Sequence, residues 1–126
     1  MRIYRKISEK KKEKILQIIK KFFQKEKFVK ECIVFGSFVK RNYFRDIDIG
    51  LVGNIDEDVI SKFASRLERK LGVEVDIKIF DEMPAPVKFE VLKYGKFLLK
   101  NKKFKQYKYE FIKRYIDFVE WWKKWI

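Results

Sequence analysis

The sequence predicts an α/β fold, a small mixed sheet flanked by helices, because short apolar runs alternate along the chain with segments of helical periodicity. The 126 residues suffice for one domain with a real core and are too few for two ordinary domains. We therefore expect a single domain over residues 1–126. It comprises a basic amphipathic N-terminal helix in 1–30, a core in 31–100 and an aromatic C-terminal helix in 104–126.

The N-terminal segment is strongly basic and amphipathic. Ser8 can cap a helix that we expect to extend to residue 29, because apolar residues recur in it at helical spacing. The lysines lie mostly on the other side of this helix. Their charge has two interpretations, a binding face for RNA or another partner, or an ordinary solvated surface. The apolar residues are Ile15, Ile18, Ile19, Phe22 and Phe23.

Strands and helices alternate through the core segment. A short helix or turn is expected from Ser37, and a longer helix begins after Asp56 and ends at Gly72, because an acidic cap opens it and glycine stops it. Another helix follows the prolines at 84 and 86 and runs to about Tyr94. The segments between them are apolar or alternate in polarity, as strands do. The four expected strands are residues 31–36, 46–52, 73–80 and 97–99.

The C-terminal segment carries two apolar stripes on one long helix. The first consists of Phe104, Tyr107, Phe111, Tyr115, Phe118, Trp122 and Trp125, and the second of Tyr109, Ile112, Ile116 and Val119. A domain face can cover only one stripe, so the other is a candidate partner surface. Aromatic residues of the last turns are its expected anchors, because buried tryptophan and tyrosine dominate interface energetics. They are Tyr115, Phe118, Trp121, Trp122 and Trp125.

The composition excludes several classes of site. Without histidine and with one cysteine, Cys32, the chain alone cannot form a histidine-based triad, a Cys–His dyad, a Cys/His zinc site or an internal disulfide. Cys32 precedes an apolar run and is expected to be a buried thiol. No apolar run is long enough to span a bilayer, and residues 1–4 lack the apolar stretch of a signal peptide. We therefore expect a cytoplasmic protein without membrane contact.

The charge balance points to polyanionic partners. The formal net charge is +14 and the sequence pI is about 9.8. Such a balance favours a nucleotide, a nucleic acid or an acidic protein surface as the partner, without choosing among them.

One short motif indicates phosphate chemistry. Gly36 permits close backbone approach, and Ser37 can open a helix whose free N–H groups attract a polyphosphate. Asp46 and Asp48 follow on the second expected strand. Residues two apart on a strand share a face with Cα atoms ~6.7 Å apart, so these two carboxylates can converge on one divalent cation. A phosphate-binding turn beside a metal-binding pair suggests nucleotidyl transfer.

A third carboxylate, Asp76, lies on the next expected strand and completes the set. Together with Gly36-Ser37 and the Asp46-x-Asp48 pair, it resembles the motif of the minimal nucleotidyltransferases of the DNA polymerase β superfamily. The resemblance implies a polymerase-β-type nucleotidyltransferase fold.

This resemblance covers residues 31–100 and makes them the expected catalytic core. It implies that the site takes ATP with two Mg²⁺ ions, held by Asp46 and Asp48, while Asp76 shares one metal and helps to deprotonate the acceptor hydroxyl. Paired metals ~3.5–4 Å apart stabilise both the attacking and the leaving oxygen of an in-line displacement. The implied nucleotide-binding residues are Gly36, Ser37, Lys40 and Arg41.

The chain departs from the family pattern in three places. The spacer between Ser37 and Asp46 is shorter than usual. Lys40-Arg41 stands where Arg-Gly is common, and Arg45 replaces a frequent serine. None of these changes removes a metal ligand. A lysine or arginine can still balance triphosphate charge, although lysine lacks the bidentate fork of arginine.

The tail, residues 109–118, also resembles that of MntA-type antitoxins in HEPN/MNT toxin–antitoxin pairs. This implies an ATP-dependent adenylyltransferase that AMPylates a tyrosine of a HEPN-type ribonuclease toxin, neutralises it and forms a hetero-oligomer with it. Two alternatives stay open. One is a noncatalytic antitoxin or binding module that acts through the C-terminal helix, and the other is nucleotidyl transfer to RNA or a small molecule.

Overall fold

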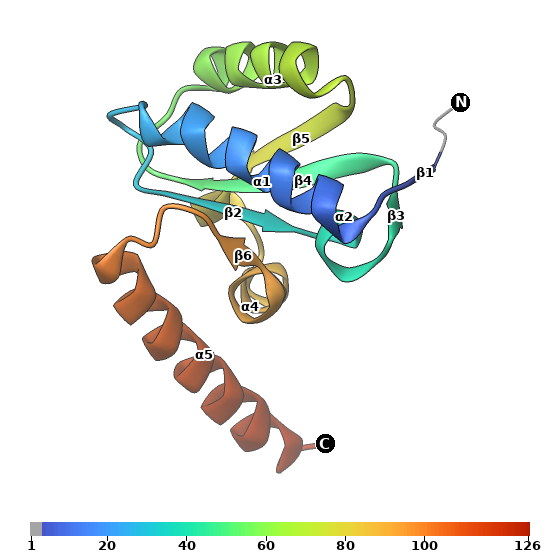
Figure 1. Ribbon diagram of the computed structural model, residues 1–126. Helices are drawn as coiled ribbons and strands as arrows, with labels where there is room; N and C mark the ends of the chain where they lie inside the picture. The colour runs from blue at the N-terminus through green and yellow to red at the C-terminus, as the bar shows by residue number, and fades with distance from the viewer. Residues whose placement is uncertain (1–3) are drawn as a thin grey trace.

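The computed structural model describes residues 4–126 and has a four-stranded mixed sheet at its centre (Figure 1). The sheet consists of β2 (Glu31–Phe35), β4 (Asp46–Val52), β5 (Glu74–Ile79) and β6 (Lys96–Phe97), in the order β5-β4-β2-β6. The β4 and β5 strands are parallel, whereas β2 is antiparallel to both β4 and β6. The predicted small mixed sheet is therefore confirmed.

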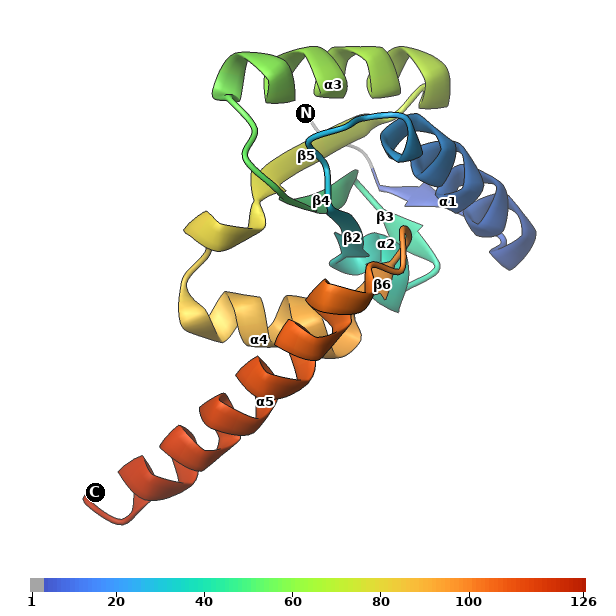
Figure 2. The same cartoon turned by 90° about the vertical axis from the view of Figure 1, so that its left-hand side faces the viewer.

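Helices cover both faces of this sheet (Figures 1 and 2). One layer contains α1 (Glu9–Gln24) and α3 (Glu57–Leu71), and the opposite layer contains α4 (Ala85–Tyr94) and the first part of α5 (Lys102–Lys123). The side chains of β2 alternate between the two layers, with Cys32 and Val34 in the first core and Ile33 in the second. Because both faces are covered, this strand is apolar almost throughout.

The N-terminal segment differs from the sequence prediction. The α1 helix begins after its Ser8 cap, whose hydroxyl accepts a hydrogen bond from the Lys11 N–H at 3.3 Å, but it ends at Gln24 rather than near residue 29. Before it, β1 (Arg5–Lys6) pairs with β3 (Tyr43–Phe44), a small second sheet that the sequence did not predict. Strands of two residues carry too little periodicity to be recognised. The first three residues of the predicted 1–30 segment lie outside the described residues.

A buried carboxylate connects the sheet to the C-terminal helix. Glu31 is fully buried at the start of β2, and its carboxylate accepts hydrogen bonds from the backbone N–H groups of Cys32, Leu99 and Asn101, each at 2.9 Å. The strand predicted for residues 97–99 is correspondingly shorter, since Leu99 bonds to this side chain instead of continuing the ladder. Asn101 then caps α5 by accepting from the Phe104 N–H.

The long C-terminal helix packs on the domain through its first half only. Phe104 is buried, and Tyr107, Phe111 and Ile112 pack against the second core. Beyond them the helix projects away from the sheet (Figures 1 and 2). Phe118, Trp121 and Trp122 are about half exposed and Trp125 more so, at 56%, 51%, 51% and 70%.

Tyr115 lies at the boundary between the packed and the projecting part of α5. Its ring stacks on Phe89 of α4, with ring centroids 4.6 Å apart. Of the five aromatic residues predicted to anchor a partner, it is the one whose ring stacks on a ring of another helix within residues 4–126. Within residues 4–126, no helix combines the length and the apolar composition needed to cross a membrane.

Candidate active site

Neighbouring strands bring the three predicted carboxylates together. Asp46 and Asp48 alternate along β4 with Ile47 and Ile49, which are fully buried in the first core, so the aspartates face the opposite side of the sheet. The adjacent parallel strand places Asp76 directly beside Asp48 in register. Local strand geometry thus accounts for the first pair, and strand pairing adds the third carboxylate.

The electrostatics of these carboxylates show that they share one region. Burial, together with the negative charges of Asp46 and Asp76, raises the pKa of Asp48 from 3.8 to about 6. Two cations, Lys78 and Arg45, act in the opposite direction. The Lys78 ammonium also lies 3.6 Å from an Asp76 carboxylate oxygen, in a pair whose side chains are 59% and 44% exposed. The site therefore concentrates negative charge that its own cations compensate only in part.

The donor set suits a hard divalent cation. Among residues 4–126 no three carboxylate or thiol side chains lie in an arrangement that could hold a metal ion as it stands. The three aspartates nevertheless offer only oxygen donors, which Mg²⁺ prefers, and a cation would oppose the burial and the repulsion that together raise the Asp48 pKa. A metal would compete with the Lys78 ammonium for Asp76.

The Gly36-Ser37 turn abuts these carboxylates. Gly36 has a φ of +79°, and a Cβ atom at this position would lie 2.2 Å from an Asp48 carboxylate oxygen. A larger residue would strain the backbone here and push the Asp48 carboxylate out of its place. Ser37 opens α2 (Ser37–Lys40), a single helical turn that is anchored by the buried ring of Phe38. The predicted phosphate-binding turn therefore lies directly against Asp48, one of the three predicted metal-binding carboxylates.

A cavity of about 360 Å³ opens beside Gly36, between the end of β2 and α4. Lys40 lies at this cavity, where its ammonium is 3.2 Å from a Glu90 carboxylate oxygen and 5.1 Å from the centre of the Tyr94 ring. The sequence analysis missed the α4 residues of this cavity. Their spacing of three and four residues places them on one face of α4. No local feature of the sequence indicates that this face packs beside Gly36. The lining residues are Phe35, Gly36, Lys40, Pro86, Val87, Glu90, Val91 and Tyr94.

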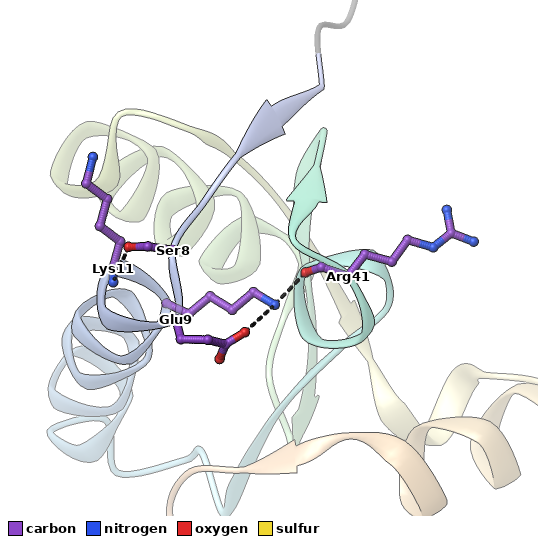
Figure 3. Close-up of polar contacts among 5 residues, drawn as sticks. Ser8, Glu9, Lys11 and Arg41 are labelled. Atoms are coloured by element: carbon purple, nitrogen blue, oxygen red, sulfur yellow. Dashed lines mark hydrogen bonds and ion pairs between the residues drawn. The ribbon is translucent and has the colours of Figure 1, made fainter.

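The two basic residues predicted to bind nucleotide lie differently. Lys40 faces the cavity, whereas the exposed side chain of Arg41 extends away from the domain (Figure 3). Arg45, the residue before the aspartate pair, lies with its guanidinium 5.4 Å from the centre of the Tyr4 ring. The roles of Ser37, Lys40 and Arg41 toward a nucleotide stay predictions.

Comparison with known proteins agrees with this geometry. Residues 17–104 match the polymerase beta nucleotidyltransferase family. The chain belongs to this family. It is also 39% identical over 66 residues to "Putative protein adenylyltransferase MJ1547" of Methanocaldococcus jannaschii, a match that covers 51% of this chain and 50% of that protein. The chain thus spans about half the length of the curated relative that it matches.

Solved structures confirm the fold over most of the nucleotidyltransferase chain. A toxin–antitoxin MntA–HepT crystal structure has a TM-score of 0.65 at 18% identity and covers 89% of this chain and 90% of its own. The structure of the tri-AMPylated Shewanella oneidensis HEPN toxin in complex with MNT antitoxin matches with a TM-score of 0.67 at 18% identity, and the match covers 90% of each chain. A toxin–antitoxin structure with AMP-PNP matches with a TM-score of 0.68 at 20% identity, and the match covers 86% of this chain and 90% of the other. These matches confirm the predicted polymerase-β-type architecture.

Proposed function

We propose that this nucleotidyltransferase transfers the AMP moiety of ATP to a protein hydroxyl, as the antitoxin partner of a HEPN-type toxin. The observation that carries the proposal is the contact between the Gly36 turn and Asp48, with Asp46 and Asp76 alongside. The name of the adenylyltransferase relative supports AMP as the transferred group. The fold shared with chains from toxin–antitoxin complexes, one with a tri-AMPylated toxin, supports a protein acceptor.

The proposed reaction is an in-line displacement at the α-phosphorus. The acceptor hydroxyl oxygen forms a bond to this phosphorus, the bond to the bridging oxygen of the β-phosphate breaks, and pyrophosphate leaves. Asp76, which comes from a different strand than the aspartate pair, takes the hydroxyl proton. Asp46 and Asp48 would hold two Mg²⁺ ions, which when bound supply Lewis-acid stabilisation of the attacking and leaving oxygens.

The cavity beside Gly36 is the proposed place of the nucleoside. It joins the phosphate-binding turn directly, and its α4 wall consists largely of apolar side chains with the Tyr94 ring at one side. An aromatic ring is a good stacking surface for a purine base. Lys40 would then exchange its exposed pairing with Glu90 for the triphosphate, since a surface ion pair of this kind is worth only about 0–1 kcal/mol. Arg41 stays a further candidate for balancing phosphate charge.

The projecting end of α5 is the proposed toxin-binding surface. Phe118, Trp121, Trp122 and Trp125 form a connected series of ring contacts that the domain does not cover. Exposed aromatic clusters of this kind mark interaction sites. Tyr115 can contribute only with the part of its ring that Phe89 leaves free. Binding there would place the toxin in a hetero-oligomer with this chain, in the cytoplasm where ATP is available.

A noncatalytic antitoxin is the second candidate function. The exposed aromatic end of α5 favours it, because this surface is separate from the three carboxylates and could neutralise a partner without transfer. Transfer to RNA rests only on the basic charge of residues 1–30, which a solvated surface explains equally well.

Incubation with ATP labelled on the α-phosphate, Mg²⁺ and a HEPN-type toxin tests the proposal. We expect label on the toxin and release of pyrophosphate, and loss of both with Asp46→Asn and Asp48→Asn together. Binding of the toxin without label would favour the noncatalytic function. Label on RNA alone, with none on the toxin, would contradict the protein acceptor.

A further inference from the structure

The N-terminal segment of the chain buries one cation beside the connection between the phosphate-binding turn and the carboxylates. Lys12 of α1 is only 6% exposed, whereas its neighbours Lys10, Lys11 and Lys14 are exposed. Burial of an ammonium group is unfavourable unless specific partners compensate the lost hydration. A lysine at this position therefore calls for a structural or functional reason.

The partners of Lys12 lie at the end of α2. Its ammonium donates a hydrogen bond to the backbone carbonyl of Arg41, the residue that ends this helical turn (Figure 3). A Glu9 carboxylate oxygen lies 3.7 Å from the same nitrogen, and the centre of the Phe38 ring lies 6.0 Å from it. A cation at a helix C-terminus is favourable because the last carbonyls there lack partners.

Backbone hydrogen bonds connect Arg41 to the proposed phosphate-binding turn. The Arg41 N–H donates to the Ser37 carbonyl at 2.9 Å, and the Lys40 N–H donates to the Gly36 carbonyl at 3.1 Å. A single helical turn of four residues is not stable by itself, because too few hydrogen bonds offset the ordering of its backbone. Its position therefore depends on the buried Phe38 ring and on the contacts that hold its far end.

The rest of the N-terminal segment holds the same connection. The Ile7 N–H donates to the Asn42 carbonyl at 2.8 Å, and β1 pairs with β3 over Arg5 to Lys6. Residues 41–44, in the spacer between Ser37 and Asp46, are thus held by residues 5–12. These residues precede the region that matches the family, which begins at residue 17.

We propose that Lys12 is a positioning residue for nucleotide binding, whose ammonium fixes the end of α2 and thereby the Gly36-Ser37 backbone that receives the phosphates. This inference rests on the proposed function. The carboxylates on β4 and β5 do not depend on the contact, because the sheet and its core hold them. Loss of the ammonium should therefore weaken ATP binding and leave the chemical step of bound ATP largely intact.

The test compares Lys12→Met with Lys11→Met in the full chain. Both variants lose one positive charge from the same turn of α1, so general attraction of ATP falls equally, but only the first loses the Arg41 contact. We expect Lys12→Met to raise the KM for ATP about tenfold and Lys11→Met less than about twofold, with kcat within about twofold of the wild type in both. Equal KM values for the two variants, or a fall in kcat without a change in KM, would overturn the proposal.

Two further measurements make each outcome decisive. If Lys12→Met does not melt cooperatively, Lys12→Gln is tested in its place with the same expected KM and kcat. If neither variant folds, Lys12 is required for the fold as a whole, and the positioning role is overturned. If the wild type neither binds nor transfers ATP, the proposed function fails, and the inference is judged by amide hydrogen exchange. Faster exchange over residues 37–44 in Lys12→Met than in Lys11→Met would then support the fixing of α2, and equal exchange would overturn it.

Discussion

The carboxylate edge of the sheet and the projecting end of α5 both hold side chains in unfavourable surroundings in the isolated chain. At the edge like charges lie close together, and on α5 aromatic surface is left in water. At the sheet edge, Asp48 is held near two other negative charges by strands whose other face is deeply buried. At the end of α5, Trp121 and Trp125 leave half or more of their surface in water, and only their own helix places them. We propose that a cation binds at the first region and that an apolar partner covers the second.

The two regions therefore differ in how rigidly their side chains are held: the carboxylates are fixed by packed strands, and the aromatic residues are held only by their own helix. Reacting groups must be held within a fraction of an ångström, which the packed strands β4 and β5 provide. A partner surface tolerates adjustment, and a helix that leaves the domain can present it without disturbing the core. Catalysis and partner binding are therefore expected to respond independently to mutation, and four predictions test this separation.

The largest effect is expected at the carboxylates. Asp48→Asn removes a charged metal ligand, so we expect transfer to fall by at least about a hundredfold while toxin binding persists. Turnover is measured by release of pyrophosphate. Asp58→Asn, an exposed change in the first turn of α3, is the control and should leave turnover unchanged. Wild-type turnover in Asp48→Asn would refute the catalytic assignment.

The next effect is expected at the end of α5. Trp121→Ala and Trp125→Ala together should lower toxin affinity by about 2–4 kcal/mol, because buried tryptophans dominate interfaces, and should leave the melting temperature unchanged. Titration calorimetry measures the affinity. Phe28→Ala serves as the control, since Phe28 is an exposed aromatic residue outside α5, at 71% against 70% for Trp125. A similar loss in the control would show that exposed aromatic area in general, not this surface, binds the toxin.

A third prediction concerns the connection between the two regions. Glu31→Ala leaves one buried and two partly buried backbone N–H groups without their acceptor, so the free energy of unfolding should fall by about 2–5 kcal/mol. Urea denaturation measures the change. Glu110→Ala, an exposed change on α5, should have an effect below about 0.5 kcal/mol. If the Glu31 variant were as stable as the wild type, the start of α5 would not depend on this carboxylate.

The smallest effect is a pH dependence of the metal-free protein. Folding raises the pKa of Asp48 to about 6 from an ordinary 3.8, so between these pH values the folded state binds more protons than the unfolded state. Stability contributed by this group therefore falls as pH rises through this window, by about 1 kcal/mol after allowance for partial exposure. Melting temperatures in a chelator at pH 4 and pH 7 measure it. Asp48→Asn should remove this component and be the more stable protein at pH 7.

Those parts of the fold and site that follow local rules could be predicted from the sequence. Gly72 ends α3 in the left-handed conformation, and Ser8 caps α1 with its side-chain oxygen, as predicted. The shared face of Asp46 and Asp48 follows from strand periodicity. The β1–β3 pair could not be predicted, since it joins two short segments that are distant in the chain.

By itself, the sequence determined which groups this protein offers: three strand aspartates, a glycine–serine turn and a long aromatic helix. Only the tertiary structure decided how they combine. The register of β5 on β4 set Asp76 beside Asp48, the packing of α4 formed the cavity next to Gly36, and contacts with Phe89 divided α5 into a packed and a projecting half. Periodicity tells which side of an element is apolar, but what covers that side is set by packing against elements far away in the chain.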